Sequence, residues 1–133
     1  MAQSVASTGS FPRGRIHTVY TGQVERFDTT ARDLFTLRAG DIPIGLTFFS
    51  PAASNAGTSA RVSIGSTGNA TFFSVGIEVK SGTQSLGQSA PSSATNLCAP
   101  LPFDTVVQGT YAENGAASTS GGPWTVVMEV LGV

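Results

Sequence analysis

The chain has 133 residues, of which 40% are hydrophobic and only 11% are charged, and its formal net charge is −1. The length fits one domain, and the apolar share is large enough to build a core. The lack of a basic excess excludes a nucleic-acid binder that works through positive charge, and the scarcity of charge excludes a coiled coil or a helical bundle. The normal apolar content excludes a chain that is disordered throughout.

Residues 1–14 are expected to form an extended N-terminal arm, and residues 15–133 to form a single domain. The first ten residues of this arm are mostly small and polar. Arg13 lies near its end, and Arg15 lies just beyond it. The arm lacks the apolar stretch of a secretory signal, and no apolar run reaches the roughly 18 residues of a transmembrane helix. We therefore expect a protein that is made in a cytoplasm and has no membrane partner.

Short segments rich in β-branched and aromatic residues follow, and none of them has a helical period. The predicted strands of the first half cover residues 16–20, 23–27, 33–38 and 42–49. In the last of these, apolar residues at alternate positions predict one buried face: Ile42, Ile44, Leu46 and Phe48. Pro43 cannot donate to a ladder, so it marks a strand start or an edge.

The second half of the chain also consists of short segments with the pattern of β-strands. Residues 60–80 predict a hairpin in which Phe73, Val75, Ile77 and Val79 point inward. Residues 81–102 are loop-like, with room for one short strand, and residues 105–112 and 124–131 predict two more strands. Seven or eight short strands separated by Gly and Ser turns predict an all-β fold, an antiparallel β-sandwich that is jelly-roll-like.

Residues suited to catalysis are sparse. One histidine, His17, excludes a zinc site built on several histidines, and one cysteine, Cys98, excludes an intrachain disulfide. Glu78 and Glu129 lie on outward phases of predicted strands, where we expect solvated side chains rather than a glycosidase pair. No calcium loop or nucleotide-binding loop is present. We therefore expect no enzymatic activity, no cofactor and no bound metal.

Apolar residues on the outward phases of the strands are the most informative feature. Phe49 and Phe72 are the outward members of two adjacent pairs, and Val127 and Leu131 lie on the phase opposite Trp124. Outward apolar residues on several strands favour a subunit interface. The alternative is that these strands are central and are covered by the second layer or by the arm.

Four segments carry a resemblance to a known family. They are GDIPIGLT (Gly40–Thr47), NAGTSARVSIGSTGNA (Asn55–Ala70), FDTVVQGTY (Phe103–Tyr111) and GAASTSGGPWTVVMEV (Gly115–Val130). From about residue 33 to its end, the chain resembles the capsid decoration, or cement, proteins of tailed bacteriophages. The resemblance implies a jelly-roll or related sandwich, commonly trimeric, that sits at the joints between major capsid subunits. It implies no catalytic residues.

These observations together predict a virion structural protein on the capsid surface. We expect a homotrimer that binds the major capsid protein and stabilises the head, with Arg13 and Arg15 as candidates for pairing with acidic groups of that partner. A tail, baseplate or fibre component stays open as an alternative. A carbohydrate-binding module is another; it would use Trp124, Tyr20 or Tyr111 as a platform, although the inward phase of Trp124 counts against it.

Overall fold

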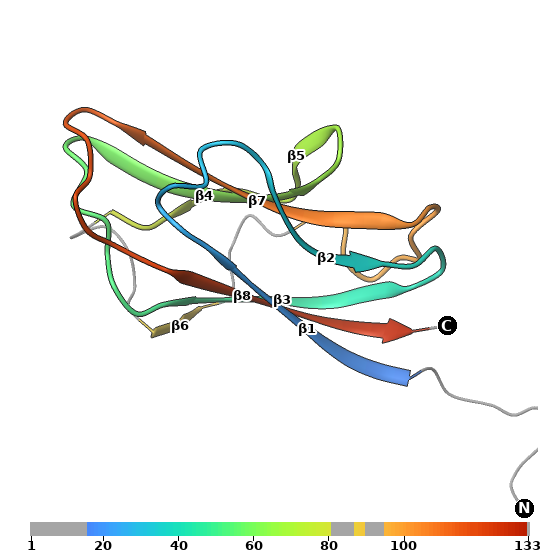
Figure 1. Ribbon diagram of the computed structural model, residues 1–133. Helices are drawn as coiled ribbons and strands as arrows, with labels where there is room; N and C mark the ends of the chain where they lie inside the picture. Colours follow the sequence, from blue (N-terminus) through green and yellow to red (C-terminus); the bar gives the residue numbers. More distant parts are fainter. Residues whose placement is uncertain (1–15, 81–86, 90–94, 133) are drawn as a thin grey trace, which may run out of the picture.

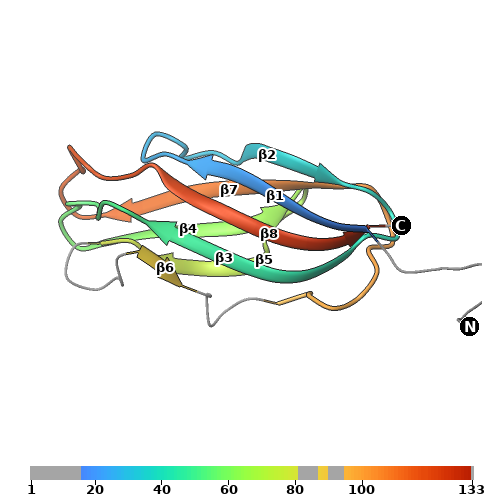
Figure 2. The same ribbon diagram turned by 90° about the horizontal axis from the view of Figure 1, so that it is seen from below.

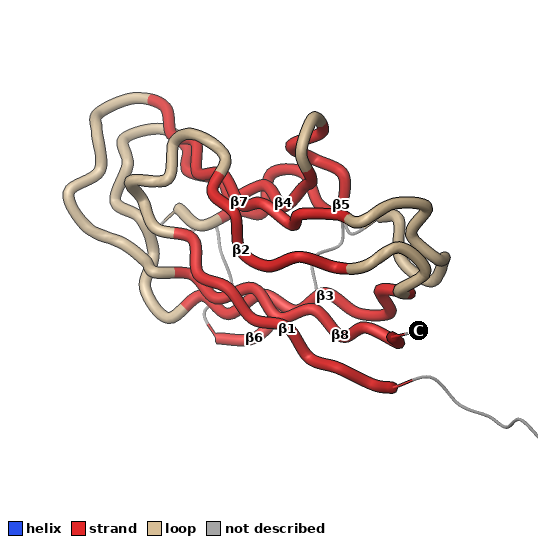
Figure 3. Tube along the Cα trace, turned by 45° about the vertical axis from the view of Figure 1, so that its right-hand side comes forward, coloured by secondary structure: helices blue, strands red, loops and turns tan. Residues whose placement is uncertain are grey.

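Two four-stranded antiparallel sheets face each other in the computed structural model, which describes residues 16–80, 87–89 and 95–132 (Figure 1). The first, here called the β8 sheet, contains in spatial order β1 (Ile16–Val24), β8 (Trp124–Gly132), β3 (Ile42–Ser50) and β6 (Gly87–Ser89). The second, the β7 sheet, contains β2 (Arg32–Leu37), β7 (Thr105–Asn114), β4 (Ser59–Ser66) and β5 (Asn69–Glu78). The described residues are strands and loops (Figure 3), and no helix capable of crossing a membrane occurs among them.

The strand pairing is nested. The first strand pairs with the last, β2 with β7, β3 with β6, and β4 with β5, always antiparallel. The chain therefore behaves as one long hairpin that is rolled so that successive pairs alternate between the two layers. This is the jelly-roll arrangement of eight strands, and it confirms the predicted fold class. Figure 2 shows β1, β8, β3 and β6 side by side in that order. The short strand expected within residues 81–102 is β6.

The core lies between the two sheets and is built from the inward phases of their strands. Trp124 of the β8 sheet stacks on Tyr111 of the β7 sheet, with ring centroids 5.3 Å apart and an interplanar angle of 9°. The largest fully buried side chains are Trp124, Tyr111, Phe48, Phe73, Leu37, Ile64 and Met128. The predicted inward phases of Leu46, Phe48, Phe73, Val79 and Trp124 are thus confirmed.

The two strands predicted at residues 16–20 and 23–27 are in fact one, β1, which runs through Gly22. Gly22 marks a close approach instead of a turn, because a Cβ at this position would lie 2.8 Å from Cβ of Leu34 on β2. The chain turns only after Val24. There the amide of Asp28 donates to the carbonyl of Glu25, and the amide of Glu25 donates to the Asp28 carboxylate.

Two irregularities break the alternation that the sequence predicts. In β3 the register against β8 shifts between Pro43 and Gly45, so Ile42 and Ile44 are only half-buried and Ile44 is out of phase with Leu46. Pro43 itself lies at the start of the strand, as predicted.

In β5 the predicted inward Val75 is 58% exposed. The register against β4 shifts beside it, between Val62 and Ile64. Gly76 adopts a positive φ of 62°, and its amide donates to Oγ of Ser63 at 3.2 Å. The extra residue of this bulge turns Val75 to the outside.

A hydrogen-bond network closes one end of the sandwich. The buried Tyr111 hydroxyl donates to Oε1 of Glu113 at 2.7 Å and lies 2.6 Å from Oγ of Ser54, which therefore donates to it. Glu113 also accepts the Ser118 hydroxyl at 2.6 Å and the Ser118 amide at 3.0 Å. The Ser118 carbonyl accepts Nη1 of Arg26 at 3.2 Å. These bonds join the β1–β2 turn, the β3–β4 connection and the β7–β8 loop.

The pKa values of the two ionisable groups at the centre of this network, Glu113 and Tyr111, are shifted in opposite directions. The bonds from Ser118, first its hydroxyl and then its amide, lower the pKa of Glu113. Burial raises the pKa of Tyr111, so the phenol stays protonated and can donate.

Deletion of residues 128–133 should unfold the protein, because it removes Met128 and Val130 from the core and strips both β1 and β3 of much of their pairing with β8. Circular dichroism would report loss of the β-sheet signal. The outward-pointing substitution Leu131→Ala is the control and should stay folded. A truncated chain that kept a cooperative thermal transition would contradict the central position of β8.

Glu113→Gln should destabilise the protein by about 1 kcal/mol near neutral pH, because the amide loses one of the acceptors that bind Ser118. A carboxyl whose pKa is lowered on folding stabilises the folded state above its ordinary pKa of about 4.3, and this contribution is lost as the pH falls. The stability gap between the two proteins should therefore shrink below about pH 4.3. Urea denaturation across an acid pH series would measure it, and a constant gap would contradict the assignment.

Candidate interaction surface

The outer face of the β8 sheet is made of residues that pair across β1, β8 and β3. Because residues paired across strands share one side of a sheet, the outward positions of β8 define four rows. In order, the rows are His17, Leu131 and Ile42; Val19, Glu129 and Gly45; Thr21, Val127 and Thr47; Gln23, Thr125 and Phe49. We call this surface the β8 face.

The β8 face has almost no charge. Its four rows contain one carboxylate, Glu129, and no lysine or arginine. A Cβ built on Gly45 would lie 3.4 Å from Oε1 of Glu129, so that carboxylate leans over the neighbouring strand. Val19 is 53% exposed, while Phe49 and Val127 are half-buried.

The outer face of the β7 sheet differs because its polar side chains pair with each other. Arg61 forms an ion pair with Glu78 across β4 and β5. Nε2 of Gln108 donates to Oδ1 of Asp33 at 2.7 Å, and Nδ2 of Asn114 donates to Oγ of Ser59 at 3.2 Å. This sheet therefore presents polar groups already bonded within the chain. The β8 face instead presents apolar and hydroxyl side chains, which suit a contact with another protein surface.

Three of the side chains predicted to form an interface come together on the β8 face: Phe49, Val127 and Leu131. Phe72 lies apart from them, on β5 of the other sheet. Its ring packs edge-on against Phe73, with centroids 4.8 Å apart, and it contacts the core. Arg13 and Arg15 lie outside the described residues. An interface role for all six stays a prediction.

Sequence reasoning missed the contribution of β1 to this surface. Val19 alternates with Thr21 and Gln23 on the outward phase of that strand. The alternation of residues 17, 19, 21 and 23 could have indicated this contribution. It was divided because the sequence predicted two strands, separated near Gly22, where the structure has one.

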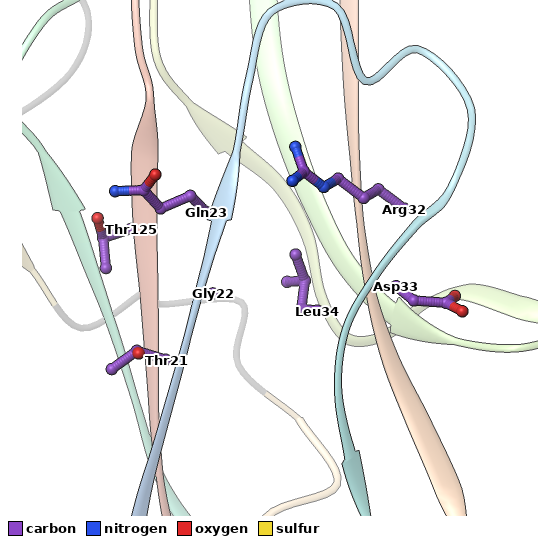
Figure 4. Close-up of a pocket in the computed structure, with 7 residues that line it drawn as sticks. All are labelled: Thr21, Gly22, Gln23, Arg32, Asp33, Leu34 and Thr125. Atoms are coloured by element: carbon purple, nitrogen blue, oxygen red, sulfur yellow. The ribbon is translucent and has the colours of Figure 1, made fainter.

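Two depressions lie on the described surface, the first at the β1 edge of the β8 face and the second on the β7 sheet side. One, of about 410 Å³, lies between β1 and β2 (Figure 4) and is lined by Thr21, Gly22, Gln23, Arg32, Asp33, Leu34 and Thr125. The other, of about 350 Å³, includes Phe72 and Phe103, and Phe103 is 74% exposed. Arg32 beside the first depression is bound to Asp28 and Glu25, and both of these contacts raise the pKa of its guanidinium.

The residues considered for a glycosidase pair and for a sugar platform lie on different sheets or are packed against other side chains. Across residues 16–80, 87–89 and 95–132, no three His, Cys, Asp or Glu side chains gather to hold a metal. Glu78 and Glu129 lie on different sheets. Of the proposed sugar platforms, Trp124 and Tyr111 are buried and Tyr20 stacks on Phe35 at 5.3 Å.

Comparison with known proteins gives two similar solved structures, both from phage capsids. One is a chain of the cyanophage Pam1 capsid asymmetric unit, with a TM-score of 0.69 and 24% identity; the match covers 100% of this chain and 96% of that one. The other belongs to the acid-stable capsid of Helicobacter pylori bacteriophage KHP30, with a TM-score of 0.61 and 14% identity, covering 89% and 87%. No family model and no curated protein matches the sequence. The comparisons therefore confirm the expected resemblance to phage capsid-associated proteins at the level of the fold.

Proposed function

We propose that this chain is a structural protein of a bacteriophage virion that decorates and cements the capsid. It binds the capsid surface after synthesis in the host cytoplasm, bridges neighbouring major capsid subunits, and stabilises the head as a homotrimer. It needs no cofactor and has no enzymatic activity.

The observation that carries this proposal is the similarity to chains in two phage capsid structures, one of them matched over the whole of this chain. Both are capsid structures, which favours the head over the tail or baseplate. The four sequence segments that carry the resemblance point to the same class of protein.

The β8 face supports the proposal through its chemistry. A bridging protein must bind a partner surface and must tolerate many copies of itself nearby, and a face with one carboxylate limits repulsion between copies. Phe49, Val127 and Leu131 supply apolar area at its centre and end, and its threonines supply hydrogen-bonding groups at the same surface. Cyclic symmetry then lets each copy bury the same patch.

Co-sedimentation with capsids that lack this protein, prepared from the phage that encodes it, tests the proposal. The native chain should sediment with the capsids and distribute over the head. Val127→Lys should weaken binding at least about tenfold, because a buried unpaired charge costs more than the 1.4 kcal/mol that corresponds to that factor. The measurement is a binding isotherm from the pelleted fraction.

Thr110→Lys is the matched control, because Thr110 is an outward, half-buried residue of β7, the corresponding central strand of the other sheet. Both variants should keep the native circular dichroism spectrum, and Thr110→Lys should bind like the native chain. A native chain that stays in the supernatant would refute the proposal. Equal loss in both variants would refute the role of the β8 face.

Deletion of residues 1–14 tests the proposed arm separately. If the arm extends over the capsid, the shortened chain should fold normally and bind capsids more weakly. Arg13→Ala together with Arg15→Ala in the full chain should weaken binding and reduce its dependence on salt, if these side chains pair with acidic groups. Binding identical to that of the native chain would remove the arm from the interface.

A further inference from the structure

Strand β1 has one edge that no described residue pairs with. It is the outermost strand of the β8 sheet, and its nine residues are in unbroken register with β8 from Ile16 opposite Gly132 to Val24 opposite Trp124. In such a strand, alternate residues direct both N–H and C=O away from the existing partner. The outer edge of β1 is therefore a long template for one more strand.

Edge strands of natural proteins usually carry devices that prevent further pairing, such as charges, prolines, bulges or short length. The sequence of β1, IHTVYTGQV, has no proline and no Asp, Glu, Lys or Arg, and its pairing has no bulge. Its exposed Ile16 and Val19 add apolar surface along the same strand.

The remaining edge strands of the described fold do carry such devices. β6 is three residues long. β2 contains a register shift beside Asp33 and begins with Arg32. β5 is bulged at Gly76, and its Phe72 and Phe73 carbonyls already accept bonds from Thr95 and Asn96. Only β1, among the described strands, is left unprotected.

We propose that the free edge of β1 binds an extended, uncharged segment of the major capsid protein as an added β-strand. This inference rests on the proposed capsid function and names how the partner is held. Backbone hydrogen bonds would supply affinity, and alternate side chains of the added strand would supply specificity. The occupant is uncharged because β1 has no Asp, Glu, Lys or Arg and the adjoining β8 face has a single carboxylate, Glu129, which leans toward Gly45 on the far side of β8, so a buried charge would lose its hydration without an ion-pair partner beside it.

A second copy of this chain fits the edge less well. A cyclic trimer joins unlike surfaces of neighbouring copies, so β1 would have to pair with another edge strand of the next copy. The described candidates, β2, β5 and β6, are bulged, occupied or short. Among the described strands, none therefore suits the edge of β1 in a neighbouring copy, which favours a different partner.

The depression between β1 and β2 supplies a place for side chains of the added strand. It opens beside Gly22, with Leu34 on one side and Arg32 and Asp33 along β2 (Figure 4). Both charged groups already have partners, Arg32 with Asp28 and Asp33 with Gln108. A strand docked along β1 would pass over this depression and direct every second side chain toward it.

Hydrogen exchange of the full chain, free and bound to capsids that lack this protein, tests the inference. Amides of β1 that face the outer edge should exchange rapidly in the free chain and at least tenfold more slowly on capsids. Amides of β8 serve as the internal control, because they are already bonded on both sides. If the chain binds capsids while the β1 amides exchange as in the free chain, the inference is wrong and the capsid function stands.

Absence of capsid binding would overturn both proposals. Protection of the β1 amides in the free chain that increases with protein concentration would show that a second copy fills the edge, and would also overturn the inference.

A pair of proline variants provides an independent reading. Neighbouring residues direct their N–H groups to opposite edges, so one of Thr18→Pro and Val19→Pro removes only an outer N–H. The variant that keeps the native circular dichroism spectrum should bind capsids at least tenfold more weakly, while alanine at the same position should bind normally. A folded proline variant with unchanged binding would contradict the added strand, and if neither variant folds, hydrogen exchange decides.

Discussion

The pairing of β8 with β1 on one edge and β3 on the other is the constraint on which the rest of the molecule depends. Because successive residues of a strand point to opposite sides, this one strand delivers Trp124, Met128 and Val130 to the core and Val127 and Leu131 to the β8 face. A slip by one residue would exchange the two sets. The buried stack of Trp124 on Tyr111 holds the register, since it joins β8 to the opposite sheet.

The fold class could be predicted from the sequence because period-two alternation and Gly/Ser turns are local signals. The bulges could not. Val75 continues an apolar alternation in the sequence, and only the pairing of β5 with β4 shows that Gly76 inserts an extra residue there. At Gly22 the sequence predicted a break between two strands, whereas the strand continues. The prediction was wrong because a glycine required for close approach to Leu34 has the same sequence signature as a glycine in a turn.

The candidate surface was predictable only in part, for the same reason. Phase along one strand identified Phe49, Val127 and Leu131, but the sheet to which each strand belongs decides which side chains meet. Phe72 shares the outward phase with Phe49 and lies on the other sheet, where it packs against Phe73. The Tyr111–Glu113–Ser118 network was not predicted either. Its hydrogen bonds exist only because the Tyr111 hydroxyl is buried and the loop that carries Ser118 folds back to it.

The nested pairing also governs the order in which the molecule can form. Ile16 pairs with Gly132, near opposite ends of the chain, whereas β4 and β5 are joined by a turn at Thr67 and Gly68. Local pairings close quickly and distant ones slowly, so we expect the β4–β5 hairpin to form first and the β8 sheet to be completed last. On this order of folding, the unpaired edge of β1 would be fixed in place last and presented only by the finished sandwich.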